Sequence, residues 1–185
     1  MAAASTAIAA TTVSAGAVAI WPRATQDPGP DPARAPIRVV GGRVAVEIPP
    51  GWAVRRVTGG PGSRRIEVTS PTDPRSALHI TSAYTPESTL SQAAAVLGRA
   101  AAAEPAVFLD FDDAAHIAGR PALTYREVRP GRVVTWAVVL DGAMRIGIGC
   151  QSAPGSEESL RPVCRTAVAS ARDVGGTAPA PDASK

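Results

Sequence analysis

Apolar and polar residues alternate with a period of two along several stretches of the first half of the chain. Valine, isoleucine, leucine or tyrosine recur on one parity in residues 44–48, 65–69 and 78–84. This period predicts half-buried β-strands, because successive side chains of a strand point to opposite faces. Residues 54–58 are expected to pair with them. Stretches rich in proline, glycine or serine separate the strands at residues 49–51, 59–62 and 70–74.

The pattern in the second half predicts a meander of strands at residues 108–112, 121–128, 132–140 and 143–151. The last three are joined by short turns at residues 129–131 and 141–142, and a parallel pair would need a much longer crossover. These strands are therefore expected to be antiparallel. Residues 132–140 are apolar on both faces, which predicts a central strand with a layer on each side of the sheet.

Two segments have apolar residues at helical spacing. In the first, leucines and alanines recur from Leu90 to Ala101, after residues 85–88, which suit a helix start, and before Pro105, which ends the helix. In the second, the apolar stripe runs from Leu160 to Ala171, with residues 154–156 as the cap and two glutamates in the first turn. The order strands, helix, strands, helix predicts an α+β fold, with an antiparallel sheet meander flanked by helices in an α/β/α sandwich.

Composition divides the chain into four segments. Residues 1–21 carry no charged side chain but are rich in alanine, which predicts a weak transmembrane or signal-like segment. A membrane anchor, a cleaved signal and a soluble tail are all compatible with it. Residues 22–36 hold five prolines and form a linker, residues 37–174 form the α+β domain, and residues 175–185 form a disordered tail.

Charge narrows the classes of partner. The net charge of the 185 residues is only +3, and Lys185 is the one lysine among 19 basic residues. The composition excludes a coiled coil, a collagen-like chain, a wholly disordered chain and a multi-span membrane protein. The densest basic pairs, Arg55-Arg56 and Arg64-Arg65, have no tyrosine or phenylalanine interleaved with them. Because nucleic-acid-binding faces usually combine basic and aromatic residues, we expect no nucleic-acid partner.

The two cysteines are placed to meet. Cys150 shares a strand face with apolar residues, and Cys164 lies on the apolar stripe of the helix that follows after a short loop. We expect a structural disulfide, which implies an oxidising compartment. The alternative is a pair of buried free thiols that act as small apolar side chains. Two cysteines and two distant histidines do not have the spacing of a zinc site, so no metal is expected.

Candidate catalytic groups are few. A hydrolase would need a serine or cysteine within hydrogen-bond reach of His79 or His116, and each histidine has the pattern of an ordinary surface residue. The glycine-rich residues 59–64 join strand to strand and lack the following helix of a phosphate-binding loop. Three acidic residues indicate a solvated face rather than a cation site, namely Asp110, Asp112 and Asp113. We therefore expect neither an enzyme nor a cofactor.

Six phrases together resemble the C-terminal domain of the actinobacterial type VII secretion-associated protein family. The resemblance covers roughly residues 40–174. Members typically carry a cytoplasmic N-terminal domain, one membrane segment and then this domain outside the membrane, and their wider relatives have a Mog1/PsbP-like fold. The phrases are "VAVEIPPGWAVRR", "GGPGSRRIEVTSP", "LHITSAYTPESTL", "AGRPALTYREVRPG", "VVTWAVVLDGAMRIGIGCQSAPG" and "CRTAV".

The resemblance implies a non-enzymatic accessory protein of a type VII (ESX-like) secretion system. Such a protein would be a single-pass membrane protein with its domain on the extracytoplasmic side, and its partners would be components of the secretion machinery. The expected contact surface consists of an exposed Trp52 with Arg55, Arg56, Arg64 and Arg65, together with the open edge of the sheet. The alternative is a cell-envelope domain that binds a small ligand or lipid in a pocket between sheet and helix.

Overall fold

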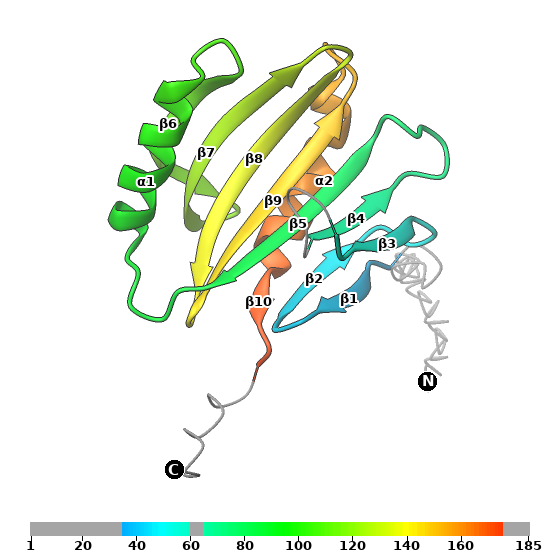
Figure 1. Cartoon of the computed structure of the whole chain (residues 1–185). Coiled ribbons are helices and arrows are strands. Elements are labelled where there is room, and N and C mark those ends of the chain that lie inside the picture. The colour runs from blue at the N-terminus through cyan, green and yellow to red at the C-terminus, as the bar shows by residue number, and fades with distance from the viewer. Residues whose placement is uncertain (1–34, 60–64, 176–185) are drawn as a thin grey trace, which may run out of the picture.

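The computed structural model describes residues 35–59 and 65–175. The segment 1–21, most of the linker, the tail from residue 176 and Arg64 lie outside these residues. Seven strands form one antiparallel sheet (Figure 1). Their order across the sheet is β3 (Ala53–Val57), β4 (Arg65–Thr69), β5 (Ala77–Tyr84), β9 (Met144–Ser152), β8 (Arg132–Asp141), β7 (Arg120–Arg129) and β6 (Phe108–Ile117).

A second, three-stranded sheet was not expected. It consists of β1 (Ile37–Gly41), β2 (Val44–Ile48) and the two-residue β10 (Arg172–Asp173), in the order β1-β2-β10. The strand predicted at 44–48 is therefore the centre of this small sheet and not part of the meander. The Arg43 guanidinium, between β1 and β2, forms an ion pair with Asp173 of β10, with Nη2 2.8 Å from a carboxylate oxygen. Such pairings between distant residues leave no local signal in the sequence.

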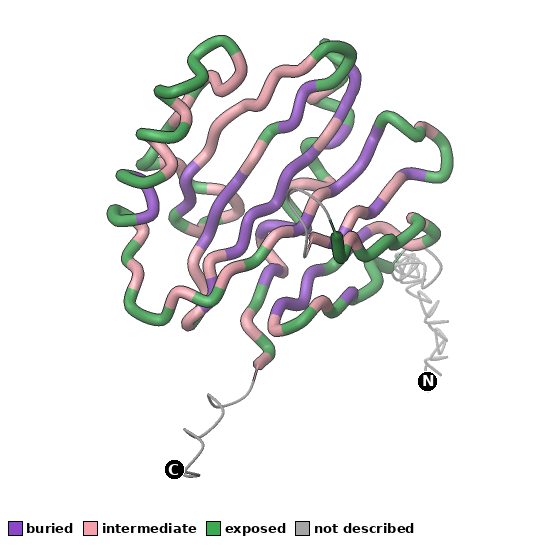
Figure 2. Tube along the Cα trace, in the orientation of Figure 1, coloured by how far each residue is buried: buried purple, intermediate pink, exposed green. Residues whose placement is uncertain are grey.

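One face of the large sheet is covered by α2 (Glu157–Ser170) and the small sheet. Figure 2 shows buried residues running along β8, β9 and β5. The side chains that meet between the layers come from alternate positions of each strand, as the period of two requires. They include Val68, Leu78, Val139, Ile146 and Ile148 from the sheet, Val46 and Ile48 from β2, and Ala167 and Val168 from α2.

The opposite face is covered by α1 (Leu90–Ala103) near β6 and β7. Ala93 and Ala94 of α1 pack with Leu123 of β7 and Val138 of β8. On this side, β5 and β9 carry no helix in the described part of the chain (Figure 1). The α+β prediction is confirmed, since the domain is mostly antiparallel sheet with two helices. The prediction that residues 132–140 form an interior strand also holds, because β8 lies between β9 and β7.

Two local predictions need correction. The first helix begins at Leu90 and not near residue 86, because Thr89 is the N-cap and forms a capping box with Gln92. The strand expected at 108–112 continues to Ile117, so it also contains His116. Asp110 has a φ of 55° at a register shift in β6, which interrupts the regular alternation of side chains along this strand.

The C-terminal end of α2 is held by Arg120 of β7. Its Nη1 donates to the carbonyl oxygens of Val168, at 2.8 Å, and of Ala171, at 2.7 Å. Its Nη2 lies 3.3 Å from a carboxylate oxygen of Asp141. The last carbonyls of a helix have no partner within the helix, so this guanidinium supplies a donor to the Val168 carbonyl and shares the Ala171 carbonyl with Arg172.

Candidate functional site

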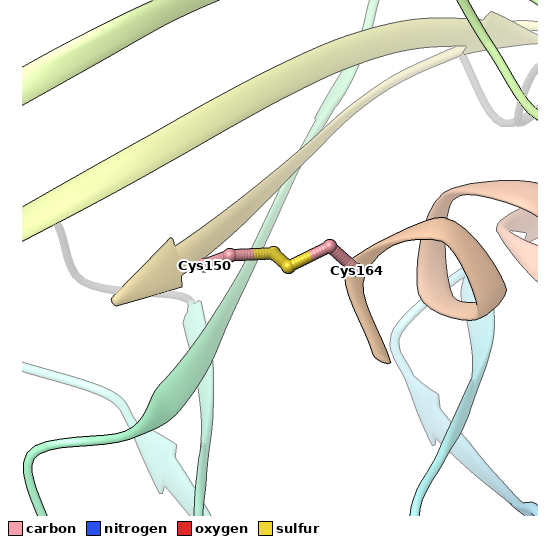
Figure 3. Close-up of a disulfide and its surroundings, with 2 residues drawn as sticks. All are labelled: Cys150 and Cys164. Carbon is pink, nitrogen blue, oxygen red and sulfur yellow. A yellow bond between two sulfur atoms is a disulfide. The ribbon is translucent and has the colours of Figure 1, made fainter. Parts of the chain in front are cut away.

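A disulfide joins Cys150 of β9 to Cys164 of α2 (Figure 3). The two Cα atoms are 6.1 Å apart, and the cysteines are separated by 14 positions in the sequence. This confirms the predicted pairing and excludes the free-thiol alternative. The bond attaches the middle of α2 to β9, so the distance between this helix and the large sheet is fixed there.

One continuous cross-strand row runs across the face of the large sheet that α1 covers only near β6 and β7. Arg55 is paired with Glu67, Glu67 with His79, and His79 with Gly149. Gly149 is paired in turn with Trp136, and Trp136 with Tyr125. Cation, carboxylate, imidazole, indole and phenol groups from five strands thus lie in one row, with Gly149 of β9 between the imidazole and the indole. We call this row and the side chains beside it on the same face the open face.

The aromatic part of the open face is tightly organised. Trp136 stacks with His79 and with Tyr125, at ring-centroid distances of 6.2 and 6.1 Å. Its indole Nε1 donates to Oε2 of Glu127 at 3.1 Å, and the other oxygen of Glu127 accepts from Arg129 Nε at 3.1 Å. Because Trp136 is anchored at its polar end, its ring has a fixed position on the sheet.

Charge on the open face is unevenly compensated. The registers place five arginines and two glutamates on this side of the sheet: Arg55, Arg65, Arg129, Arg132 and Arg145, with Glu67 and Glu127. Glu67 is bound by Arg55 at 2.8 Å and approached by Arg65 at 3.9 Å. Burial is the largest single influence on Glu67 and opposes its ionisation, but the hydrogen bond from Arg55 and the nearby positive charges together outweigh burial and lower the pKa of the carboxyl. Arg132 and Arg145 have no hydrogen-bond or ion-pair partner among the described residues.

Burial shifts the titration of two members of the row. It lowers the pKa of His79, and the hydrogen bond between Nε2 and the Gln151 amide oxygen, at 3.2 Å, opposes this only in part. Burial also raises the pKa of Tyr125 to about 12, assisted by the nearby charge of Glu127. His116 bonds to the Ala114 carbonyl. The hydrogen-bond partner of His79 is therefore an amide, and that of His116 is a backbone carbonyl. Both cysteines are in the disulfide, so neither is a thiol beside a histidine.

A hollow of about 290 Å³ lies beside the aromatic row, between the sheet and α1. Trp136 and Tyr125 line it together with Leu97 of α1, and Thr81 and Arg145 supply its polar side chains. Gly147 also lines the hollow, and it carries no side chain on this face. A glycine inside a strand often marks such a close approach, so the "GIG" of residues 147–149 is a signal that sequence analysis missed.

The predicted contact surface is only partly assembled. Arg55 and Arg65 lie on the open face, at the β3 and β4 end of the row. Arg56 points to the other side of β3, as strand alternation requires, and donates to the Val40 carbonyl at 2.8 Å. Trp52 was expected to be exposed, but it is half-buried and packs against the main core. Arg64 lies outside the described residues.

A larger cleft, of about 460 Å³, lies on the other face of the sheet beside α2. Its floor is formed by apolar side chains of β8 and β9, the disulfide and Val168. Charged side chains of α2 and Arg126 of β7 form its rim. This is the position, between sheet and helix, at which the small-ligand alternative requires a pocket.

Two further searches concern the described residues alone. Within residues 35–59 and 65–175, no group of three or more histidine, cysteine or acidic side chains is placed to hold a metal ion. The helices of the same residues, α1 and α2, are too short or too polar to cross a membrane. The predicted segment at 1–21 is not tested by this second finding.

Comparison with solved structures identifies the fold. The solution structure of cyanobacterial PsbP (CyanoP) from Synechocystis sp. PCC 6803 is similar, with a TM-score of 0.52 and 15% sequence identity over 78% of this chain and 95% of that one. LpqN of Mycobacterium tuberculosis, a protein involved in cell envelope biogenesis, gives a TM-score of 0.41 at 17% identity, over 78% of this chain and 86% of LpqN. No protein-family model matches the sequence, and neither does any curated protein. The domain therefore has a PsbP-like fold, as the resemblance implied, and identity this low shows the fold alone.

Proposed function

We propose that the chain is a non-enzymatic accessory protein of a type VII (ESX-like) secretion system that acts through protein–protein contacts outside the membrane. The observation that carries the proposal is the disulfide between Cys150 and Cys164. These cysteines lie in two of the six phrases that resemble the type VII secretion-associated family. Structural disulfides persist in oxidising compartments, so the bond supports the extracytoplasmic side that the resemblance implies. Residues 1–21 would then tether the domain, with residues 22–36 as a spacer.

The open face is the surface that best suits a protein partner. Tryptophan, tyrosine and arginine are the residue types enriched where interfaces have their largest energetic contributions. Trp136 and Tyr125 are half-buried, so part of each ring is accessible on the open face. The two glutamates of this face, Glu67 and Glu127, are already bound by arginine or indole donors. The remaining positive charge of Arg132 and Arg145 would be matched by acidic side chains. The partner surface is therefore proposed to be acidic, with apolar groups that cover the aromatic row.

Cross-linking in cells tests this proposal. A photo-cross-linking amino acid is placed at position 55 or 145 on the open face, and at position 99 on α1 or 166 on α2 as matched exposed controls. Adducts from positions 55 and 145 are expected to contain a secretion component that the two controls do not capture. If no position captures a secretion component, the proposed function is wrong. If the controls capture it equally well, the assignment to the open face is wrong.

A further inference from the structure

The cleft beside α2 has the size and lining of a small-molecule site. Its volume of about 460 Å³ lies inside the range of roughly 300–1,000 Å³ in which ligand pockets fall. The floor is apolar, with Ala137 of β8 and Ile148 of β9 below and Val168 of α2 beside them. The disulfide is part of the same lining. Because it ties α2 to β9, the cleft is already formed without a ligand, and no helix movement is needed to open it.

The side chains that α2 turns toward the cleft change in character along the helix. Glu157, Glu158 and Arg161 lie in its first turns, whereas Cys164 and Val168 follow one and two turns later. These positions recur at intervals of three and four, so they form one stripe of the helix. The cleft is thus lined by charged side chains at the N-terminal end of α2 and by Cys164 and Val168 farther along, where Arg165 borders this apolar part. A molecule that fills it would need a hydrocarbon part and a polar part.

The rim carries three arginines and two glutamates, and their pairing decides which charge the polar part should have. Glu158 is bound by Arg161 on the same helix. Arg165 has no hydrogen-bond or ion-pair partner among the described residues. It lies about 12 Å along the helix from Glu157, at 1.5 Å per residue, so these two do not neutralise each other.

Arg126 faces the same cleft from β7. Its Nε is 2.6 Å from a carboxylate oxygen of Asp110, yet the Nε–H is buried and has no hydrogen-bond acceptor in good geometry. Because this Nε is buried and already paired with Asp110, Arg126 can offer a ligand only the other nitrogens of its guanidinium. Arg165, on the helix side, is the one rim arginine without a partner among the described residues, so it is the main group available to an anion.

We propose that this cleft binds an amphipathic molecule with a single hydrocarbon chain and an acidic head, either a carboxylate or a phosphate. The chain lies on Ala137, Ile148, Val168 and the disulfide, and the head is held by Arg165, with the outer nitrogens of Arg126 across the cleft. This site is separate from the open face, on the opposite side of the sheet. The proposal does not depend on the identity of any secretion partner.

Calorimetric titration of the purified, oxidised full-length chain tests the proposal. The probes are laurate, lauroyl-lysophosphatidylglycerol and dodecanol, each below its micellar concentration. At least one of the two acids is expected to bind with one-to-one stoichiometry, and dodecanol is expected to bind at least about tenfold more weakly, because it cannot form charge-assisted hydrogen bonds. Binding of laurate alone assigns the head as a carboxylate, and binding of the lysophospholipid alone assigns it as a phosphate. Binding of neither acid, or equal binding of dodecanol, overturns the proposal.

Four variants locate the site. Thr135→Trp fills the cleft from an exposed strand position that tolerates aromatic residues, and it is expected to abolish binding. Arg165→Glu, on the exposed surface of α2, is expected to weaken binding at least about tenfold. The matched controls are Thr166→Trp on the outer side of α2 and Arg99→Glu on α1, and neither should change affinity. Unfolding midpoints of all four verify that they are folded. If folded Thr135→Trp and Arg165→Glu both bind like the parent chain, the ligand lies elsewhere and the proposal is wrong.

Discussion

Gly149 of β9 lies directly opposite Trp136 of β8, and the indole ring occupies the space that a side chain at position 149 would need. A Cβ at this position would lie 2.8 Å from Cζ3 and Cη2 of Trp136, closer than carbon atoms approach without displacement. Glu127 holds the other end of the indole through Nε1. The indole is therefore held by its carboxylate partner and by the absence of a side chain on the neighbouring strand.

Gly149→Ala is expected to displace Trp136 and to lower the free energy of unfolding by about 1–3 kcal/mol, the usual cost of overpacking. Urea unfolding measures the loss, and near-ultraviolet circular dichroism reports the tryptophan environment. Gly59→Ala is the control, because no atom of the described residues lies within 4 Å of a Cβ added there. An unchanged tryptophan signal in Gly149→Ala would contradict this account of the open face.

Removal of the disulfide is expected to destabilise the domain without changing its fold. The bond closes a loop over 14 positions, so the double variant Cys150→Ser, Cys164→Ser should lose about 3 kcal/mol through the greater entropy of its unfolded chain. In the parent chain isolated from its native host, alkylation should label the cysteines only after reduction. Labelling of both cysteines without reductant would argue for a reducing compartment and against the proposed location.

Arg120→Ala is expected to loosen the C-terminal end of α2. The guanidinium donates to the carbonyls of Val168 and Ala171, and its loss should cost about 1–3 kcal/mol because the Val168 carbonyl loses its donor, whereas Ala171 keeps Arg172. Urea unfolding and amide exchange of residues 167–171 measure the effect. Arg99→Ala removes an exposed arginine of α1 and should change stability by less than about 0.5 kcal/mol. Equal losses in the two variants would rule out the capping role.

Stability is expected to decrease as the pH falls below the ordinary histidine pKa of 6.5. Burial lowers the pKa of His79, so below pH 6.5 the unfolded chain binds a proton that the folded chain does not. The decrease levels off once the pH passes below the folded-state pKa. Urea unfolding between pH 5 and 8 measures the slope, and His79→Gln should remove part of it. His116→Gln is the control, and a larger effect from this exposed histidine would refute the assignment.

Tyr125 is expected to titrate about two units above an ordinary tyrosine, because burial raises its pKa to about 12 from 10.0. The folded pKa exceeds the unfolded one, so the contribution of Tyr125 to stability is complete below pH 10 and is lost as the pH rises toward 12. Absorbance at 295 nm follows the titration in a Tyr84→Phe background, in which Tyr125 is the remaining tyrosine. Glu127→Gln should lower the pKa, since it removes a neighbouring negative charge. A single tyrosine that titrates near 10 in the folded variant would show that the ring is not buried.

Several parts of the fold follow from local pattern alone. The alternation around Ile66, Leu78 and Ile146 specifies which side of each strand is buried, and the short turns at 129–131 and 141–142 require antiparallel neighbours. The pairing of Cys150 with Cys164 could also be predicted from the sequence. The face of the strand, the apolar stripe of the helix and the length of the loop between them are all features of fewer than two dozen consecutive residues. Helix starts were less accessible, since Thr85 and Thr89 are both suitable caps and only the capping box with Gln92 decides between them.

The candidate sites depended on the tertiary structure. Arg55 and Trp136 are 81 positions apart in the sequence, and only the strand order β3-β4-β5-β9-β8 brings them into one row. The same order separates Arg55 from Arg56, which adjacency in sequence had grouped on one surface. The sequence by itself determined most strands of the large sheet, the two helices and the pairing of the cysteines, because those depend on interactions between near neighbours. Tertiary structure decided the small sheet, the open face and the cleft, because these depend on which distant strands pair, and that choice is made by the packing of the whole domain.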